Sequence, residues 1–182
     1  MRHLIDFGDL TRAEWESLYQ RCSDIMDHPA DFMDACRGRV MASLFYEPST
    51  RTNFSFQTAM LRVGGTVFGF ADPKSTSTAK GETLKDTIKM VSGYADVVVM
   101  RNPKEGAAKA ASLYSDVPVI NAGDGGHMHP TQTTADLTTI TRLRGKVDGL
   151  SVGLCGDLKN GRTVRSLIKA LAKFEGIKFF LI

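Results

Sequence analysis

Three hydroxyl residues and an arginine follow a short apolar run, at the place where a helix is predicted to begin. The run ends at Phe45, and the polar residues are Ser49, Thr50, Arg51 and Thr52. Helix N-termini attract anions through free backbone N–H groups, and hydroxyls and guanidinium groups add directed donors. A helix cap accounts for Ser49 alone, but capping needs one hydroxyl rather than three. The cluster as a whole therefore predicts a phosphate-binding site.

Two further cations stand at places where a ligand could reach them. Lys80 ends a polar stretch that begins with Ser75-Thr76-Ser77-Thr78 and precedes a predicted helix, so it is either part of a mobile lid over an anion or an ordinary solvated lysine. Arg101 directly follows the apolar run Val97–Met100, which puts it either at the ligand edge of a sheet or in a surface ion pair.

A histidine and a glutamine flank a predicted helix start at Pro130. Proline is favoured at the first helical position, so His129 is expected near the N-cap and Gln132 in the first turn, both facing a ligand. His127 lies two residues earlier, but no carboxylate or cysteine stands at metal-ligand spacing. We expect no metal at this position.

The segment from Gly153 to Thr163 has glycines between a predicted strand and a predicted helix. It lacks the G-x-G-x-x-G spacing of dinucleotide sites, and no acidic residue follows the next strand, so a nucleotide-binding regulator is only weakly supported. Arg162 at the helix start is suited to bind a carboxylate.

Short apolar runs alternate with helical patterns along the chain, which predicts an α/β fold with a parallel sheet flanked by helices on both faces. Ligands of such sheets bind at the carboxyl ends of the strands, where the candidate residues fall. The expected strands are 40–45, 66–70, 97–100, 117–120, 150–155 and 177–182, and the expected helices start near 12, 52, 82, 107, 130 and 164. Thr11 and Glu14 predict a capping box for the first helix, and Gly123 to Gly126 predict a loop.

The last third of the chain predicts the start of a second unit. We expect one domain over residues 1–148 and the first βαβ unit of an incomplete, Rossmann-like domain over 149–182. A βαβ piece this small cannot bury its own apolar faces. The chain is therefore expected to be the front part of something longer, or to be completed by another chain.

Composition excludes several classes of protein. Of 182 residues, 42% are apolar and 24% charged, and 23 basic residues against 20 acidic ones give a net charge of +3, which favours a globular protein over a disordered one or a nucleic-acid binder. Three widely spaced cysteines argue against disulfides and zinc. Because no signal peptide or membrane span is evident, we expect a cytoplasmic protein.

With these residues in view, the chain resembles the aspartate/ornithine carbamoyltransferase family over essentially its whole length, and more closely the aspartate type. The motifs recur in the family's order: Ser49 to Thr52, Lys80-Gly81-Glu82, Arg101, His129 to Gln132, and Gly156 to Thr163. The ornithine type typically has Lys in place of Glu47 and Cys in place of Thr131, and lacks the Asn121 to Gly125 run.

The resemblance implies transfer of a carbamoyl group from carbamoyl phosphate to L-aspartate, without cofactor or metal. Thr52, Arg101 and His129 would polarise the carbamoyl oxygen, and Gln132 would orient the carbamoyl amide. Arg162 is the only aspartate-binding residue that the resemblance places. The residues implied to hold the phosphate are Ser49, Thr50, Arg51, Thr52 and Arg101, with Ser77 and Lys80 contributed by a neighbouring subunit.

The resemblance also implies a homo-oligomer, with a trimer expected, and leaves regulatory chains open. Thr76 competes with Ser77 as the loop ligand. Because the family's chain continues beyond residue 182, only the carbamoyl phosphate half of the site is expected here. The remaining alternatives are an ornithine-type enzyme and a non-catalytic carbamoyl phosphate-binding or assembly module.

Overall fold

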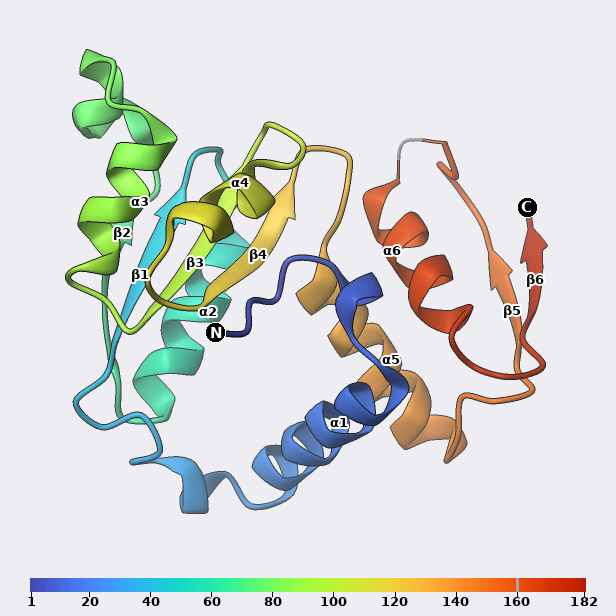
Figure 1. Cartoon of the computed structure of the whole chain (residues 1–182). Helices are drawn as coiled ribbons and strands as arrows, with labels where there is room; N and C mark the ends of the chain where they lie inside the picture. Colours follow the sequence, from blue (N-terminus) through green and yellow to red (C-terminus); the bar gives the residue numbers. More distant parts are fainter. Residues whose placement is uncertain (160) are drawn as a thin grey trace.

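The computed structural model of the chain describes residues 1–159 and 161–182. Its strands and α-helices alternate along the chain (Figure 1). The strands are β1 (Val40–Phe45), β2 (Thr66–Phe70), β3 (Val97–Asn102), β4 (Val119–Asp124), β5 (Ser151–Leu154) and β6 (Lys178–Leu181). The helices are α1 (Arg12–Asp27), α2 (Thr50–Arg62), α3 (Leu84–Ser92), α4 (Ala107–Tyr114), α5 (Pro130–Arg144) and α6 (Arg162–Leu171). Short 3-10 turns are η1 (Phe7–Asp9), η2 (Pro29–Phe32), η3 (Pro73–Ser75) and η4 (Ser77–Lys80).

Four parallel strands form the main sheet in the order β2-β1-β3-β4. Successive side chains of a strand point to opposite faces, so β1 contributes to two cores. Ala42 and Leu44 belong to the core under α3 and α4, whereas Met41 and Phe45 pack with Met60 of α2 on the other face. Helices therefore cover both faces of the sheet, as the sequence predicts.

A second, two-stranded parallel sheet pairs β5 with β6 through the crossover helix α6. Figure 1 shows this sheet and the main sheet at opposite sides of the molecule, with α5 and α6 between them. Ala170 and Leu171 of α6 are fully buried in a core with Leu137 of α5 and with Phe7 and Trp15. The βαβ unit predicted from the sequence is thus present, and residues from the N-terminal part of the chain bury its helix.

Most predicted elements match the structure, and the exceptions have local causes. The strands 40–45 and 66–70 are confirmed to the residue, and the capping box of Thr11 and Glu14 is present. The loop predicted for 123–126 is wrong in its first half: β4 continues to Asp124, which pairs with Asn102 of β3, and the turn begins at Gly125. The stretch 75–78, predicted as an irregular loop, lies in two 3-10 turns. In the part of the chain that the structure describes, no helix is long and apolar enough to cross a membrane.

Candidate anion-binding site

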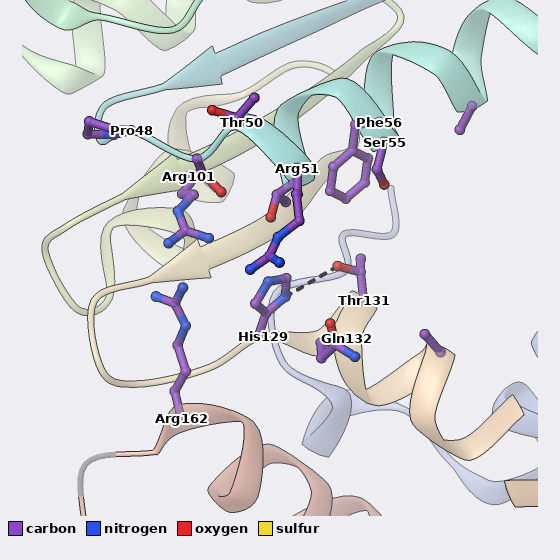
Figure 2. Close-up of a pocket in the computed structure, with 14 residues that line it drawn as sticks. Pro48, Thr50, Arg51, Ser55, Phe56, Arg101, His129, Thr131, Gln132 and Arg162 are labelled. Atoms are coloured by element: carbon purple, nitrogen blue, oxygen red, sulfur yellow. Dashed lines mark hydrogen bonds between the residues drawn. The ribbon is translucent and has the colours of Figure 1, made fainter. Parts of the chain in front are cut away.

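A cavity of about 880 Å³ opens at the carboxyl ends of β1, β3 and β4, where the first turns of α2, α5 and α6 converge (Figure 2). Eight of the residues singled out in the sequence line it: Ser49, Thr50, Arg51, Thr52, Arg101, His129, Gln132 and Arg162. The others that line it are Pro48, Ser55, Phe56, Ala59, Thr131 and Ala135. Segments more than a hundred residues apart in the chain are therefore brought together at one place.

The helices that begin at this cavity lack a side-chain cap. The N-cap residues are Ser49 for α2, His129 for α5 and Gly161 for α6, and at none of these positions does a side chain accept a capping hydrogen bond from a backbone N–H of the helix. The reading of Ser49 as an ordinary cap is therefore wrong. Backbone N–H groups at the start of α2 and α5 remain available to an anion, and the positive ends of the helix dipoles favour one there.

Two arginines enter the cavity from different parts of the chain and share one carboxylate. The Arg101 Nε lies 2.6 Å from Glu47 Oε1, and the Arg162 NH1 lies 3.9 Å from the same oxygen. Their side chains are only 13% and 21% exposed, and Arg162 also donates to the Gly125 carbonyl over 2.6 Å. Figure 2 shows the two guanidinium groups pointing toward each other. Because the two guanidinium groups share Glu47 and Arg51 lines the same cavity, positive charge remains for a ligand.

The imidazole of His129 is buried and neutral at neutral pH. Burial, followed by the positive charges of Arg162 and Arg101, lowers the pKa of His129 from 6.5 to about 4, and Asp124 opposes that shift. The ring Nδ1 lies 3.4 Å from Thr131 Oγ1 (Figure 2). A neutral imidazole offers one N–H to a ligand and one lone pair to a neighbour.

The same electrostatic setting affects Arg162. Burial and the nearby Arg101 lower the pKa of the Arg162 guanidinium, and Glu47 and Asp124 act against this. The cations of the cavity therefore repel one another in the absence of a ligand. A dianion such as phosphate would relieve this repulsion.

Two predicted site residues lie elsewhere in this chain. Ser77 and Lys80 are exposed and line a separate cavity of about 640 Å³ beside Phe68 and Phe70. The competing residue Thr76 is half-buried, and its hydroxyl donates to the Pro73 carbonyl over 2.7 Å. Within one chain, the 73–81 segment does not complete the cavity around Arg51.

Some cavity residues were not singled out in the sequence. Ser55, Phe56 and Ala59 follow Thr52 at intervals of three and four residues, which is the spacing that places side chains on one helix face. That spacing was available in the sequence as a signal. Glu47 was noted only as a family difference, and its position between two arginines depends on contacts that no local pattern encodes.

The structure contains no evident metal-binding cluster in the residues it describes. Over 1–159 and 161–182, no group of three or more histidine, cysteine, aspartate or glutamate side chains could hold a metal ion. His127 points its Nδ1 at Asp124 Oδ2 over 3.3 Å, whereas His129 faces the arginines. The two histidines therefore have different surroundings.

Comparison with known proteins identifies relatives over the whole chain. Residues 2–142 match the family described as "Aspartate/ornithine carbamoyltransferase, carbamoyl-P binding domain". The chain is 56% identical over 181 residues to an aspartate carbamoyltransferase catalytic subunit of Clostridium perfringens and equally to one of Clostridium acetobutylicum. All of this chain is covered in both alignments, but it spans only 59% of the length of either relative.

Solved structures with the same fold point to the same group. The catalytic subunit of M. jannaschii aspartate transcarbamoylase matches with a TM-score of 0.92 and 48% identity, covering 100% of this chain and 60% of that one. A Trypanosoma cruzi aspartate transcarbamoylase, solved in complex with carbamoyl phosphate and aspartate, matches with a TM-score of 0.90 and 39% identity, covering 97% and 59%. These similarities confirm the predicted fold class and the family resemblance.

Proposed function

Since the chain belongs to the aspartate/ornithine carbamoyltransferase family, we propose that it carries the carbamoyl phosphate half of an aspartate carbamoyltransferase site. The observation that supports this most directly is the cavity itself. Uncapped starts of α2 and α5 meet Arg51, Arg101 and a neutral His129 in one place. That combination suits a ligand with a phosphate at one end and a carbonyl at the other.

The phosphate would bind at the start of α2. Ser49, Thr50, Arg51 and Thr52 line the cavity there, and Arg101 approaches from the end of β3. The carbamoyl oxygen would lie between Thr52, Arg101 and His129, and Gln132 in the first turn of α5 would hold the carbamoyl amide. In this arrangement the phosphate meets cations and hydrogen-bond donors, and the carbamoyl group meets both donors and an acceptor.

The proposed reaction joins the amine of aspartate to the carbamoyl carbon. The amine lone pair forms the new C–N bond, and the carbonyl becomes a tetrahedral oxyanion that Thr52, Arg101 and His129 stabilise. The C–O bond to phosphate then breaks, phosphate leaves with the electron pair, and it accepts the amine proton. The products are N-carbamoyl-L-aspartate and phosphate, and His129 acts as a hydrogen-bond donor rather than as a nucleophile.

The aspartate half of the site extends only as far as Arg162 in this chain. We propose a boundary between residues 148 and 149, with the carbamoyl phosphate domain before it and the beginning of the aspartate domain after it. The second sheet supports this boundary because β5 and β6 pair with each other and not with the main sheet. Arg162 would bind a carboxylate of aspartate from the start of α6.

Ser77 and Lys80 would reach the cavity of a second copy. Both are exposed on the 73–81 segment and do not line the anion-binding cavity of their own chain, which fits a site shared between subunits of a homotrimer. Because the Thr76 hydroxyl is engaged within its own turn, Ser77 is the better candidate for the shared ligand. The proposed reaction would serve pyrimidine biosynthesis in the cytoplasm. The proposed trimer could also bind regulatory chains.

Two other functions make different predictions. An ornithine-type enzyme is disfavoured because that type typically has Lys in place of Glu47 and because the named relatives are of the aspartate type. A non-catalytic assembly module would have no need of the phosphate contacts.

Calorimetric titration with phosphonoacetamide, a stable analogue of carbamoyl phosphate, tests the proposal. We expect the chain to bind this analogue, and we expect Arg51→Ala to weaken binding by at least tenfold. Arg37→Ala is the control, because the side chain of Arg37 is 79% exposed and lies in a surface ion pair with Asp34. Absence of binding, or equal affinity of the Arg51→Ala variant, would overturn the proposal in favour of an assembly module.

A bisubstrate analogue that carries both a phosphonate and an aspartate-like dicarboxylate locates the second half of the site. If only the carbamoyl phosphate half is present, the two analogues bind this chain with similar affinity. Much tighter binding of the bisubstrate analogue would contradict that part of the proposal and require an aspartate site formed by these residues or by another copy.

A further inference from the structure

A buried carboxylate lies at the end of β4, behind the cavity. Asp124 is 2% exposed, and its Oδ1 accepts hydrogen bonds from the Asn121 side-chain amide and the Met128 backbone N–H, each over 3.1 Å. Its Oδ2 accepts the Gly106 backbone N–H over 3.0 Å and lies 3.3 Å from His127 Nδ1. Donors from several segments therefore meet at one side chain that does not line the cavity.

These bonds fix a turn that carries cavity groups at both of its ends. The turn spans residues 125–128, and the carbonyl of Gly125 at its start accepts a hydrogen bond from Arg162 over 2.6 Å. At its end, Met128 is held by Asp124, and the next residue is His129, the N-cap of α5. Moving the carboxylate would therefore move both the support of Arg162 and the base of the His129 side chain.

Asp124 also supplies negative charge under the cationic groups. Four charged residues on different elements face His129: Arg51 of α2, Arg101 of β3, Arg162 of α6 and Asp124 of β4. Among them only Asp124 acts to raise the pKa of the imidazole, and it acts in the same direction on the pKa of Arg162. A carboxylate placed behind the arginines thus helps to keep them close together.

We propose that Asp124 is a positioning residue that sets the His129 ring and the Arg162 guanidinium for the ligand through the turn 125–128. This inference rests on the proposed function for the identity of the ligand, but the geometry of the turn is independent of it. The chemical reason is that a site binds best when its groups are held in place before the ligand arrives.

The test compares Asp124→Asn with Asp96→Asn. Asp96 is a matched control because it also accepts a backbone N–H, that of Val40 over 2.9 Å, and pairs with Arg39, but it lies at the opposite end of the main sheet. Both variants lose a carboxylate that anchors backbone. Only Asp124→Asn is expected to alter the cavity.

The first readout is nuclear magnetic resonance of the His129 ring in the chain without ligand. We expect Asp124→Asn to shift the ring resonances and to lower the pKa of His129 further, whereas Asp96→Asn leaves both unchanged. The second readout is phosphonoacetamide affinity, which should fall at least fivefold in Asp124→Asn. Loss of a negative charge alone would raise the affinity for an anion, so a fall identifies positioning.

The outcomes separate this inference from the proposed function. If the native chain does not bind phosphonoacetamide, the proposed function fails, and the ring resonances alone decide the role of Asp124. Unchanged His129 resonances in Asp124→Asn, equal changes in Asp96→Asn, or unchanged or tighter analogue binding would overturn the inference. If Asp124→Asn does not fold, Asp124→Glu keeps the charge but displaces the carboxylate, and native His129 resonances in that variant would equally overturn it.

Discussion

Two pairs of helices begin with polar N-cap residues but use them differently. In α1 and α3, Thr11 and Thr83 cap their own helices: each hydroxyl accepts the backbone N–H of the residue three positions on, and each also contacts that residue's carboxylate. In α2 and α5, the N-cap residues Ser49 and His129 form no such bond. The protein itself caps the starts of α1 and α3, whereas the starts of α2 and α5 lack such a side-chain acceptor.

The difference shows which polar groups serve stability and which are left for binding. A capped start satisfies donors that would otherwise need water, and this contributes about 1 kcal/mol to folding. The starts of α2 and α5 forgo that contribution beside a cavity that also holds Arg51, Arg101 and Arg162. An anion placed there would supply the missing acceptors, so stability and ligand affinity should respond to different substitutions.

The largest expected effect is on ligand affinity, in Arg101→Ala. Arg101 is 13% exposed and sits between Glu47 and the cavity, so its charge-assisted bonds to a phosphate form away from bulk water. Loss of such bonds costs about 1.5–3 kcal/mol, or roughly a 10- to 150-fold weaker affinity for phosphonoacetamide. Calorimetric titration measures this directly.

The control for this prediction is Arg39→Ala. Arg39 pairs with Asp96 at the other end of the sheet, and its side chain is 66% exposed. A solvent-screened surface pair of this kind contributes little to stability and should not influence the cavity. If Arg39→Ala weakened binding as much as Arg101→Ala, the cavity would not be the anion site.

The next effect concerns the backbone behind the arginines. Gly123 has a φ of +119°, and a Cβ placed there would lie 3.4 Å from Arg162 Cζ and 3.5 Å from Arg101 NH1. We expect Gly123→Ala to cost about 1–3 kcal/mol of unfolding free energy because an L side chain rarely adopts that conformation. The Cβ would make ordinary van der Waals contact with both guanidinium groups, so we expect analogue affinity to fall through the strained backbone rather than through a clash.

Gly153→Ala is the matched comparison on the second sheet. Nothing lies within 4 Å of a Cβ at Gly153, so we expect a change of about 0.5 kcal/mol or less and native affinity. Denaturant unfolding and titration of both variants check the pair. Equal stability of the two alanine variants would show that the positive φ of Gly123 does not strain an alanine at that position.

A smaller effect contrasts the two kinds of helix start directly. Thr11→Ala should lower the unfolding free energy by about 1 kcal/mol and leave phosphonoacetamide binding unchanged, because its hydroxyl completes a capping box. Ser49→Ala should show the reverse pattern, with little change in stability and weaker binding. Unfolding curves with and without the analogue separate the two, and a stability loss in Ser49→Ala equal to that in Thr11→Ala would erase the distinction.

The sequence predicted the parts of the fold that depend on local pattern. The strand 40–45, the capping box at Thr11 and the start of α5 at Pro130 follow from residues adjacent in the chain. The end of β4 could not be predicted in this way, because the glycines there usually indicate a loop. Here Asp124 pairs with Asn102 and is buried among backbone donors, so tertiary contacts outweigh the local preference.

The sequence predicted which residues belong to the candidate site, but only part of their arrangement. Residues at strand ends and helix starts were found because a parallel sheet brings those positions together. Glu47 between two arginines, the neutral state of His129 and the role of Asp124 were not, since each depends on burial and on charges from distant segments. Such effects arise only when the chain is folded.

The smallest effect near neutral pH comes from the histidine at the start of α5. The pKa of His129 is about 4 in the folded chain and 6.5 in the unfolded reference. Between these values the unfolded chain binds a proton that the folded chain does not, so the unfolding free energy falls as pH decreases from about 6.5 to 4 and loses no more from this group below 4.

Comparison of the native chain with His129→Gln isolates that contribution. The pKa of His3 is also lowered by burial, so the native curve alone would combine two histidines. The unfolding free energy of the native chain minus that of His129→Gln should therefore be constant above pH 6.5 and should decrease as the pH falls toward 4. Phosphonoacetamide should raise the pKa of His129 in the folded chain, because an added negative charge favours the imidazolium. The pH-dependent range should then narrow from its lower limit, since the upper limit is set by the unfolded chain. The capping box at Thr11 is linked to protons through Glu14, because the hydrogen bonds from Thr11 lower the pKa of that carboxyl rather than that of a histidine. A pH profile that is identical in native and His129→Gln chains would show that the start of α5 has no histidine linkage to set it apart from the self-capped starts.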